Sequence, residues 1–300
     1  MTATSAKGAG GASAVAGVEG AVGVGASPLD KAAGENFPVA LRVLPPRLRR
    51  HLNALYCYAR YVDDLGDEAP GDRTAALHEV ADQVRRLYDG AGGGADVTDP
   101  VVAGLRPMVA EVGVPADPFL RLVEANLVDQ QVTRYTFAEL LDYCRLSANP
   151  VGEVVLHIFG VATPERIEMS DHLCTGLQLV EHWQDVAEDR RSGRVYLPQE
   201  DLRLFGVSEE DLDAPQAGEA VRALLAFETG RALAYLEAGA LLLPSLRGWA
   251  RLAVSGYLAG GRAAAAAIAR AGHDTLSGTP RAGSRQVAAA WLRASLRSPG

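Results

Sequence analysis

The 300-residue sequence has few cysteines and no excess of basic side chains. Cys57, Cys144 and Cys174 lie far apart, which excludes a disulfide framework and a cysteine-based zinc site. They are consistent with a reducing, cytoplasmic location. The 29 basic and 37 acidic residues give a net charge of −8, so nucleic acid is a poor candidate partner. An anionic ligand would need arginines, or metal ions held by carboxylates, at its binding site.

Long apolar runs and targeting signals are also lacking. A membrane-spanning helix needs about 18 or more apolar residues, and the nearest stretch, 252–268, is interrupted by Ser255, Gly260, Gly261 and Arg262. The N-terminal region lacks the apolar core of a signal peptide. We therefore expect a cytoplasmic protein that does not span the membrane.

The chain divides into a leader and one helical domain. Residues 1–30 are rich in Gly, Ala, Ser and Val, so we expect a disordered leader that cannot offset its ordering entropy. From residue 35 onward Ala, Leu, Arg and Glu dominate and alternating β-branched runs are absent, which predicts an all-α domain over 31–300. Asn149-Pro150 predicts a break, and 88–100 and 205–218 are predicted loops. Helices are predicted from Pro46 onward and over 101–112, 117–132, 136–148, 164–190, 219–243 and 246–271.

Two acidic motifs lie on two of the predicted helices. In the first, Asp63 and Asp67 are four residues apart, and in the second, Asp185 and Asp189 have the same spacing. Residues four apart share one helix face. Arg60 precedes the first motif by one turn. The second motif extends backwards into a polar ridge made of Gln178, Glu181, Asp185 and Asp189.

Carboxylates at this spacing repel each other, and inside a bundle their burial is costly without a cation. Magnesium binds carboxylates, water and phosphate oxygens, so two facing acidic ridges would hold Mg²⁺ and grip a diphosphate. The alternative is that each pair is an ordinary solvated helix face. Two copies beside arginine or glutamine favour the magnesium interpretation.

The chain resembles the squalene/phytoene synthase family of head-to-head prenyl transferases over roughly residues 35–281. The stretches that carry the resemblance are Glu35-Asn36-Phe37-Pro38, residues 58–68 (YARYVDDLGDE), residues 143–152 (YCRLSANPVG), residues 177–189 (LQLVEHWQDVAED) and residues 193–198 (GRVYLP). The resemblance implies a single-domain, isoprenoid-synthase-type helical bundle around a central apolar cavity.

The resemblance also implies a set of site residues and two or three Mg²⁺ ions bound with diphosphate. The implied metal ligands are Asp63, Asp67, Glu181, Asp185 and Asp189. The four aspartates among them are implied to be catalytic, together with Tyr143 near the ionising carbon. The implied substrate contacts are Phe37, Arg60, Asn149, Gln178, Arg194 and Tyr196. Glu181 departs from the family, which usually has Asn there, and adds a negative charge to the ridge.

Within the family, residues 35–40 (ENFPVA), 147–152 (SANPVG) and 183–189 (WQDVAED) are most similar to the hydroxysqualene synthase branch of bacterial hopanoid pathways. This implies conversion of presqualene diphosphate and water to hydroxysqualene and diphosphate. One alternative is a condensing enzyme that joins two prenyl diphosphates, such as farnesyl diphosphate, head to head. Another is a non-catalytic helical binding protein whose site has decayed at Glu181. Peripheral membrane contact during release of the apolar product is a further expectation.

Overall fold

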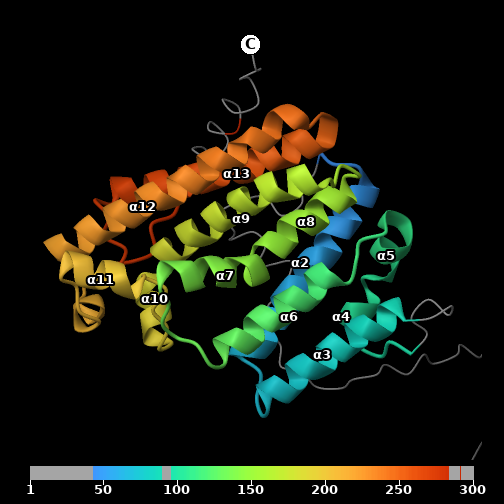
Figure 1. The fold of residues 1–300 in the computed structure, drawn as a ribbon, viewed down its shortest axis with the longest axis horizontal. Coiled ribbons are helices and arrows are strands. Elements are labelled where there is room, and N and C mark those ends of the chain that lie inside the picture. Colours follow the sequence, from blue (N-terminus) through green and yellow to red (C-terminus); the bar gives the residue numbers. More distant parts are fainter. Residues whose placement is uncertain (1–42, 90–95, 284–290, 292–300) are drawn as a thin grey trace, which may run out of the picture.

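The computed structural model describes residues 43–89, 96–283 and 291, and over these ranges it is all-α, as predicted (Figure 1). The predicted leader, residues 1–30, lies outside the described residues. The α-helices are α2 (Pro46–Asp67), α3 (Arg73–Tyr88), α4 (Pro100–Ala103), α5 (Arg106–Val112), α6 (Asp117–Asp129), α7 (Phe137–Ser147), α8 (Asn149–Ile158), α9 (Pro164–Gln184), α10 (Val186–Arg191), α11 (Gln199–Phe205), α12 (Glu219–Gly239) and α13 (Gly248–Arg270). Two 3₁₀ segments, η2 (Glu210–Asp213) and η3 (Ala240–Ser245), complete the described elements.

Local sequence explains most of the helix boundaries. Pro46 and Pro150 lie in the first turns of α2 and α8, where a missing N–H costs nothing. The Thr136 hydroxyl and the Glu139 carboxylate form a capping box at the start of α7. The structure contains three helices, α3, α8 and α11, that were not individually predicted.

Two predicted helices are interrupted in the structure, and a third, predicted over 219–243, ends as an α-helix at Gly239 and continues as the 3₁₀ segment η3. The predicted helix 101–112 is divided into α4 and α5, because Pro107 in the first turn of α5 cannot donate to a preceding carbonyl. The prediction of one helix over 164–190 is wrong at Asp185, which leaves helical geometry between α9 and α10. At this junction the Gln184 side chain bonds to the carbonyl of Pro280, and Asp185 accepts a bond from Thr279.

Helix α9 lies at the centre of the domain and packs against α7, α8, α12 and α13 (Figure 1). Its approach to α12 is close because glycines stand at the crossing. A Cβ atom on Gly176 would lie 2.8 Å from the backbone nitrogen of Leu236, and one on Gly239 would lie 2.5 Å from that of Leu173. Because the two glycines have no side chain, the backbones of α9 and α12 lie in close contact, and this contact positions α9.

Helix α13 is the one described helix that is long and apolar enough to cross a bilayer. However, 72% of its most apolar stretch is buried inside the bundle. Its apolar character is explained by packing against α9 and α12.

We expect Gly239→Ala to destabilise the fold, because the new Cβ would meet the backbone of α9, which cannot move without separating the helices. Overpacking of this kind costs about 1–3 kcal/mol. Gly230→Ala, on the same helix with nothing within 4 Å of its Cβ position, is the matched control and should be neutral or stabilising. Urea unfolding of both variants measures the difference, and equal stability of the two would contradict the packing interpretation.

Candidate active site

An apolar cavity of about 250 Å³ runs between α2, α8, α9 and α13. Its aliphatic lining includes Leu52, Leu55, Val151, Val155, Leu156, Leu173, Leu177 and Val254. Its charged lining residues, Arg60, Asp63 and Glu181, come from the C-terminal ends of the lining stretches on α2 and α9. A cavity with an apolar body and a few convergent charged groups suits a ligand with a long hydrocarbon part and an anionic head.

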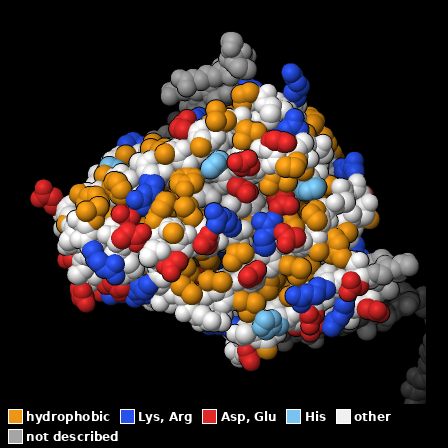
Figure 2. Space-filling model, viewed as in Figure 1, with side chains coloured by type: hydrophobic (Ala, Val, Ile, Leu, Met, Phe, Trp, Pro, Cys, Tyr) orange, Lys and Arg blue, Asp and Glu red, His pale blue; other side chains and the backbone are white. Residues whose placement is uncertain are grey.

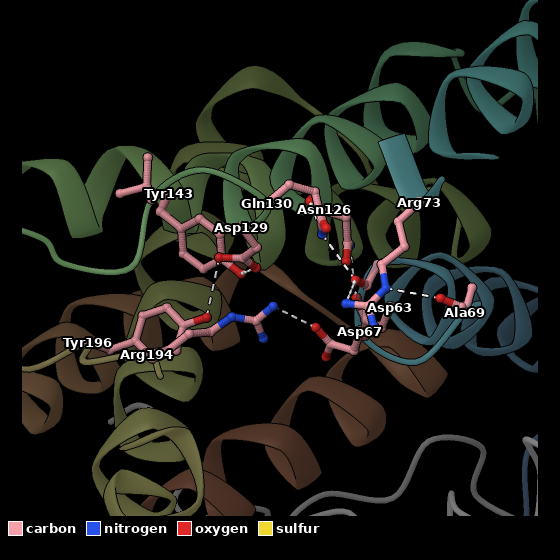
Figure 3. A network of polar contacts seen from close by, with 12 residues as sticks. Asp63, Asp67, Ala69, Arg73, Asn126, Asp129, Gln130, Tyr143, Arg194 and Tyr196 are labelled. Atoms are coloured by element: carbon pink, nitrogen blue, oxygen red, sulfur yellow. Dashed lines mark hydrogen bonds and ion pairs between the residues drawn. The ribbon is translucent and has the colours of Figure 1, made fainter. Parts of the chain in front are cut away.

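The first acidic motif occupies the last two turns of α2. Each of its three aspartates has a different partner: Asp63 accepts a hydrogen bond from Asn126 Nδ2 at 3.1 Å, Asp64 pairs with Arg60 at 2.8 Å, and Asp67 pairs with Arg194 at 2.7 Å. Figure 3 shows that the partners of Asp63 and Asp67 approach from different elements. The motif is thus held from several sides.

The second acidic motif spans the junction between α9 and α10. The Thr279 hydroxyl donates to the Asp185 carboxylate at 3.2 Å. The backbone N–H of Asp189 still donates to the carbonyl of Asp185 at 2.9 Å, so one helical turn separates the two aspartates despite the interruption. The predicted four-residue relationship is therefore retained locally.

Arg194 joins the two motifs. Its guanidinium pairs with Asp67, and its backbone N–H donates to the carbonyl of Asp189 at 2.9 Å. The following residue, Val195, donates to the carbonyl of Thr133 at 2.9 Å, which ties this segment to the loop between α6 and α7. The two acidic motifs, 118 residues apart from Asp67 to Asp185, therefore lie next to each other at one end of the bundle.

Asp129, at the end of α6, lies between the motifs and was missed by the sequence analysis. Three tyrosine hydroxyls donate to its carboxylate: Tyr143 at 2.5 Å, Tyr135 at 3.2 Å and Tyr196 at 3.3 Å. Burial raises the pKa of Asp129, and the Tyr143 hydrogen bond opposes this shift. One pattern in the sequence could have indicated Asp129. The polar residues Asn126, Asp129 and Gln130 have the i, i+3, i+4 spacing that places them on one face of a helix that is otherwise largely apolar.

At this end of the bundle the acidic side chains outnumber the arginines that pair with them, Arg60 and Arg194. Burial raises the pKa of Asp63 to about 6, although its carboxylate is accessible from the cavity; the hydrogen bond from Asn126 and the charge of Arg60 act in the opposite direction. Burial and the neighbouring Asp185 raise the pKa of Asp189 to about 8. Both shifts have the sign expected for carboxylates whose burial outweighs the effect of the nearby arginines, Arg60 and Arg194.

This donor set fits a hard divalent cation. Among the described residues, no three acidic, histidine or cysteine side chains are close enough to hold a metal ion unaided. Magnesium usually takes only one or two carboxylates and completes its shell with water and phosphate oxygens. Paired aspartates on two adjacent elements suit an ion that is shared with a bound diphosphate.

The predicted site residues fall into three groups. Arg60, Asp63, Gln178 and Glu181 line the cavity. Asp67, Asp185, Asp189 and Arg194 belong to the adjoining acidic end, as described above. The third group lies away from the cavity lining: Tyr143, Tyr196 and Asn149 are only 8%, 6% and 3% exposed.

The buried tyrosines and asparagine have protein partners. The hydroxyls of Tyr143 and Tyr196 bond to Asp129, and the amide of Asn149 bonds to Thr175 at 3.1 Å. Phe37 lies outside the described residues.

His182 stacks on Tyr196 with ring centroids 3.9 Å apart and contacts the Gln178 amide at 3.3 Å. Burial and Arg194 lower the pKa of His182 to about 3, so this imidazole is neutral.

On the face shown in Figure 2, acidic and basic side chains of the described residues are interspersed. A broad basic area, the usual electrostatic feature of a nucleic-acid interface, is not seen among them on this face.

Comparison with known proteins identifies relatives along most of the chain. The family model for squalene/phytoene synthase matches residues 30–288. Hydroxysqualene synthase from Rhodopseudomonas palustris is 37% identical over 189 residues, which cover 62% of this chain and 63% of that protein. Presqualene diphosphate synthase from the same organism is 32% identical over 211 residues, covering 69% of this chain and 74% of that protein.

Comparison with solved structures also finds proteins that are similar over most of the chain. The crystal structure of squalene synthase HpnC from Alicyclobacillus acidocaldarius is 41% identical, with a TM-score of 0.70 over 77% of this chain and 86% of that chain. A dehydrosqualene synthase solved with a ligand is 21% identical and supports the fold alone, with a TM-score of 0.75 over 84% of this chain and 87% of that chain. The chain belongs to the squalene/phytoene synthase family of prenyl transferases.

Proposed function

We propose that the protein is a magnesium-dependent hydroxysqualene synthase, which converts presqualene diphosphate and water to hydroxysqualene and diphosphate. The observation that carries this proposal is the junction of the two acidic motifs, linked by Arg194, at the charged end of an apolar cavity. The 37% identity to hydroxysqualene synthase from Rhodopseudomonas palustris supports the choice of reaction within the family.

The arrangement suits ionisation of a prenyl diphosphate. The carbon–oxygen bond to diphosphate breaks and its electron pair leaves with the diphosphate, so no protein nucleophile is needed. The chemistry that Mg²⁺ supplies when bound is neutralisation of the charge on the departing oxygens. Asp63, Asp67, Asp185, Asp189 and Glu181 would hold the metal.

Two arginines would bind the leaving group directly. Arg60 lines the cavity, and its buried Nε has no hydrogen-bond partner among the described residues. Arg194 is paired with Asp67 and would exchange part of this contact for phosphate oxygens, to which a planar guanidinium is well matched. Gln178 would contact the same head group, because this residue also lines the cavity.

The apolar part of the cavity would protect the carbocation that remains. Aliphatic walls exclude bulk water and restrict the conformations of the chain. In the proposed reaction one water oxygen then bonds to the cationic carbon and loses a proton, which gives the alcohol. Tyr143 does not line the cavity and would act indirectly, through the hydrogen bond that its hydroxyl donates to Asp129.

A condensing reaction is the second candidate. Presqualene diphosphate synthase from Rhodopseudomonas palustris and phytoene synthase from Mycobacterium tuberculosis support it, because they are 32% and 31% identical over 69% and 73% of this chain. Such an enzyme would use the same ionisation step but join two prenyl chains. Peripheral membrane contact on product release remains an expectation with either reaction.

Incubation of the purified protein with presqualene diphosphate distinguishes these reactions. We expect hydroxysqualene and diphosphate to form in the presence of Mg²⁺. Formation of hydroxysqualene, measured by gas chromatography and mass spectrometry, should stop when EDTA is added. Consumption of farnesyl diphosphate, with no turnover of presqualene diphosphate, would replace the proposal with the condensing reaction. No turnover of either substrate in the presence of Mg²⁺ would contradict both.

Replacing an aspartate of either motif should separate activity from stability. Asp63→Asn and Asp185→Asn keep an oxygen that can accept from Asn126 and Thr279, respectively, but remove a charge. We expect activity to fall by about 100-fold or more, while Tm stays the same or rises because repulsion among closely spaced carboxylates is relieved. Asp82→Asn, at an exposed position on α3, is the control. Loss of folding in either motif variant, with a normal control, would show that the aspartates are structural.

A further inference from the structure

Asp63 differs from the other aspartates of the first motif in the charge of its partner. Asp64 and Asp67 pair with arginines, whereas the hydrogen bond to Asp63 Oδ1 comes from a neutral amide, Asn126 Nδ2, at 3.1 Å. A cationic partner would compete with a metal ion for the carboxylate. A neutral donor orients the carboxylate and leaves its charge available.

The amide of Asn126 is itself fixed within the protein. Its side chain is buried, and Nδ2 also donates to the carbonyl of Leu122 at 3.2 Å, one turn earlier on α6. Gln130, one turn later, donates to the carbonyl of Gly66 at 3.0 Å and to that of Asn126 at 3.1 Å (Figure 3). These bonds fasten α6 to the helical turn that carries Asp63.

Gly66 provides the space that Asn126 occupies. A Cβ atom at this position would lie 2.3 Å from Asn126 Oδ1, which is far inside contact distance. Gly66 lies within α2 and is not among the glycines with positive φ, so its conformation does not require glycine. The glycine inside the acidic motif is explained by the close approach of Asn126.

We infer that Asn126 is a positioning residue for metal binding, which holds the Asp63 carboxylate toward the cavity through a contact that only glycine at position 66 permits. This inference rests on the proposed magnesium-dependent function. Neither Asn126 nor Gly66 would touch substrate; both would act through Asp63. Their loss should therefore weaken metal binding more than it reduces turnover at saturating metal.

Metal binding can be measured without turnover by titrating Mn²⁺ in the presence of inorganic diphosphate and following free Mn²⁺ by EPR. We expect Asn126→Leu, which keeps the size of the side chain and removes the donor, to weaken Mn²⁺ binding by about 10-fold. The Mg²⁺ concentration for half-maximal activity should rise by a similar factor, with kcat at saturating Mg²⁺ within about threefold of wild type. Glu124→Gln, at an exposed position on the same helix, should match wild type.

A double-mutant cycle keeps the inference testable if Asn126→Leu folds poorly. Gly66→Ala should weaken Mn²⁺ binding because its Cβ displaces the amide. In the Asn126→Ala background the same Gly66→Ala change should add little, since the amide is already gone. Additive effects of the two changes, or wild-type Mn²⁺ binding by Asn126→Leu, would overturn the inference. Failure of the wild-type protein to bind Mn²⁺ with diphosphate would instead contradict the proposed function.

Discussion

Negative charge gathered at one end of an apolar helical bundle is the constraint on which the site depends. Burial raises the pKa values of Asp63 and Asp189 to about 6 and about 8, so ionising either carboxylate is less favourable there than in water. Arg60 and Arg194 supply part of the missing positive charge and are already paired with Asp64 and Asp67. An arrangement of this kind is costly to the folded state and is best explained by a cationic ligand that arrives with its substrate.

Helix α6 organises this end of the molecule although it carries neither acidic motif. The Asn126 amide donates a hydrogen bond to Asp63 of the first motif, and the Asp129 carboxylate accepts hydrogen bonds from the hydroxyls of Tyr143 and Tyr196. The loop after α6 bonds to the segment that follows the second motif. The relative position of the two motifs therefore depends on a helix whose polar residues look, in sequence, like an ordinary partly solvated face.

The sequence predicted the all-α fold class and the one-turn spacing within each acidic motif, because helical periodicity and four-residue spacing are local signals. It did not predict the interruption of α9 at Asp185, which depends on contacts with Thr279 and Pro280 about 95 positions later. It also missed Asp129, because the tyrosines that bond to it converge only in three dimensions. Local patterns located the charged residues, whereas their partners depended on long-range packing.

A crystal structure with Mn²⁺ and a non-reactive thio-analogue of a prenyl diphosphate would test most directly whether the acidic end binds metal together with diphosphate. We predict anomalous Mn²⁺ peaks in contact with carboxylates of both motifs and with phosphate oxygens, and a hydrocarbon chain in the cavity beyond Arg60. Diphosphate bound without metal, or Mn²⁺ located away from Asp63, Asp67, Asp185 and Asp189, would contradict the magnesium-dependent site.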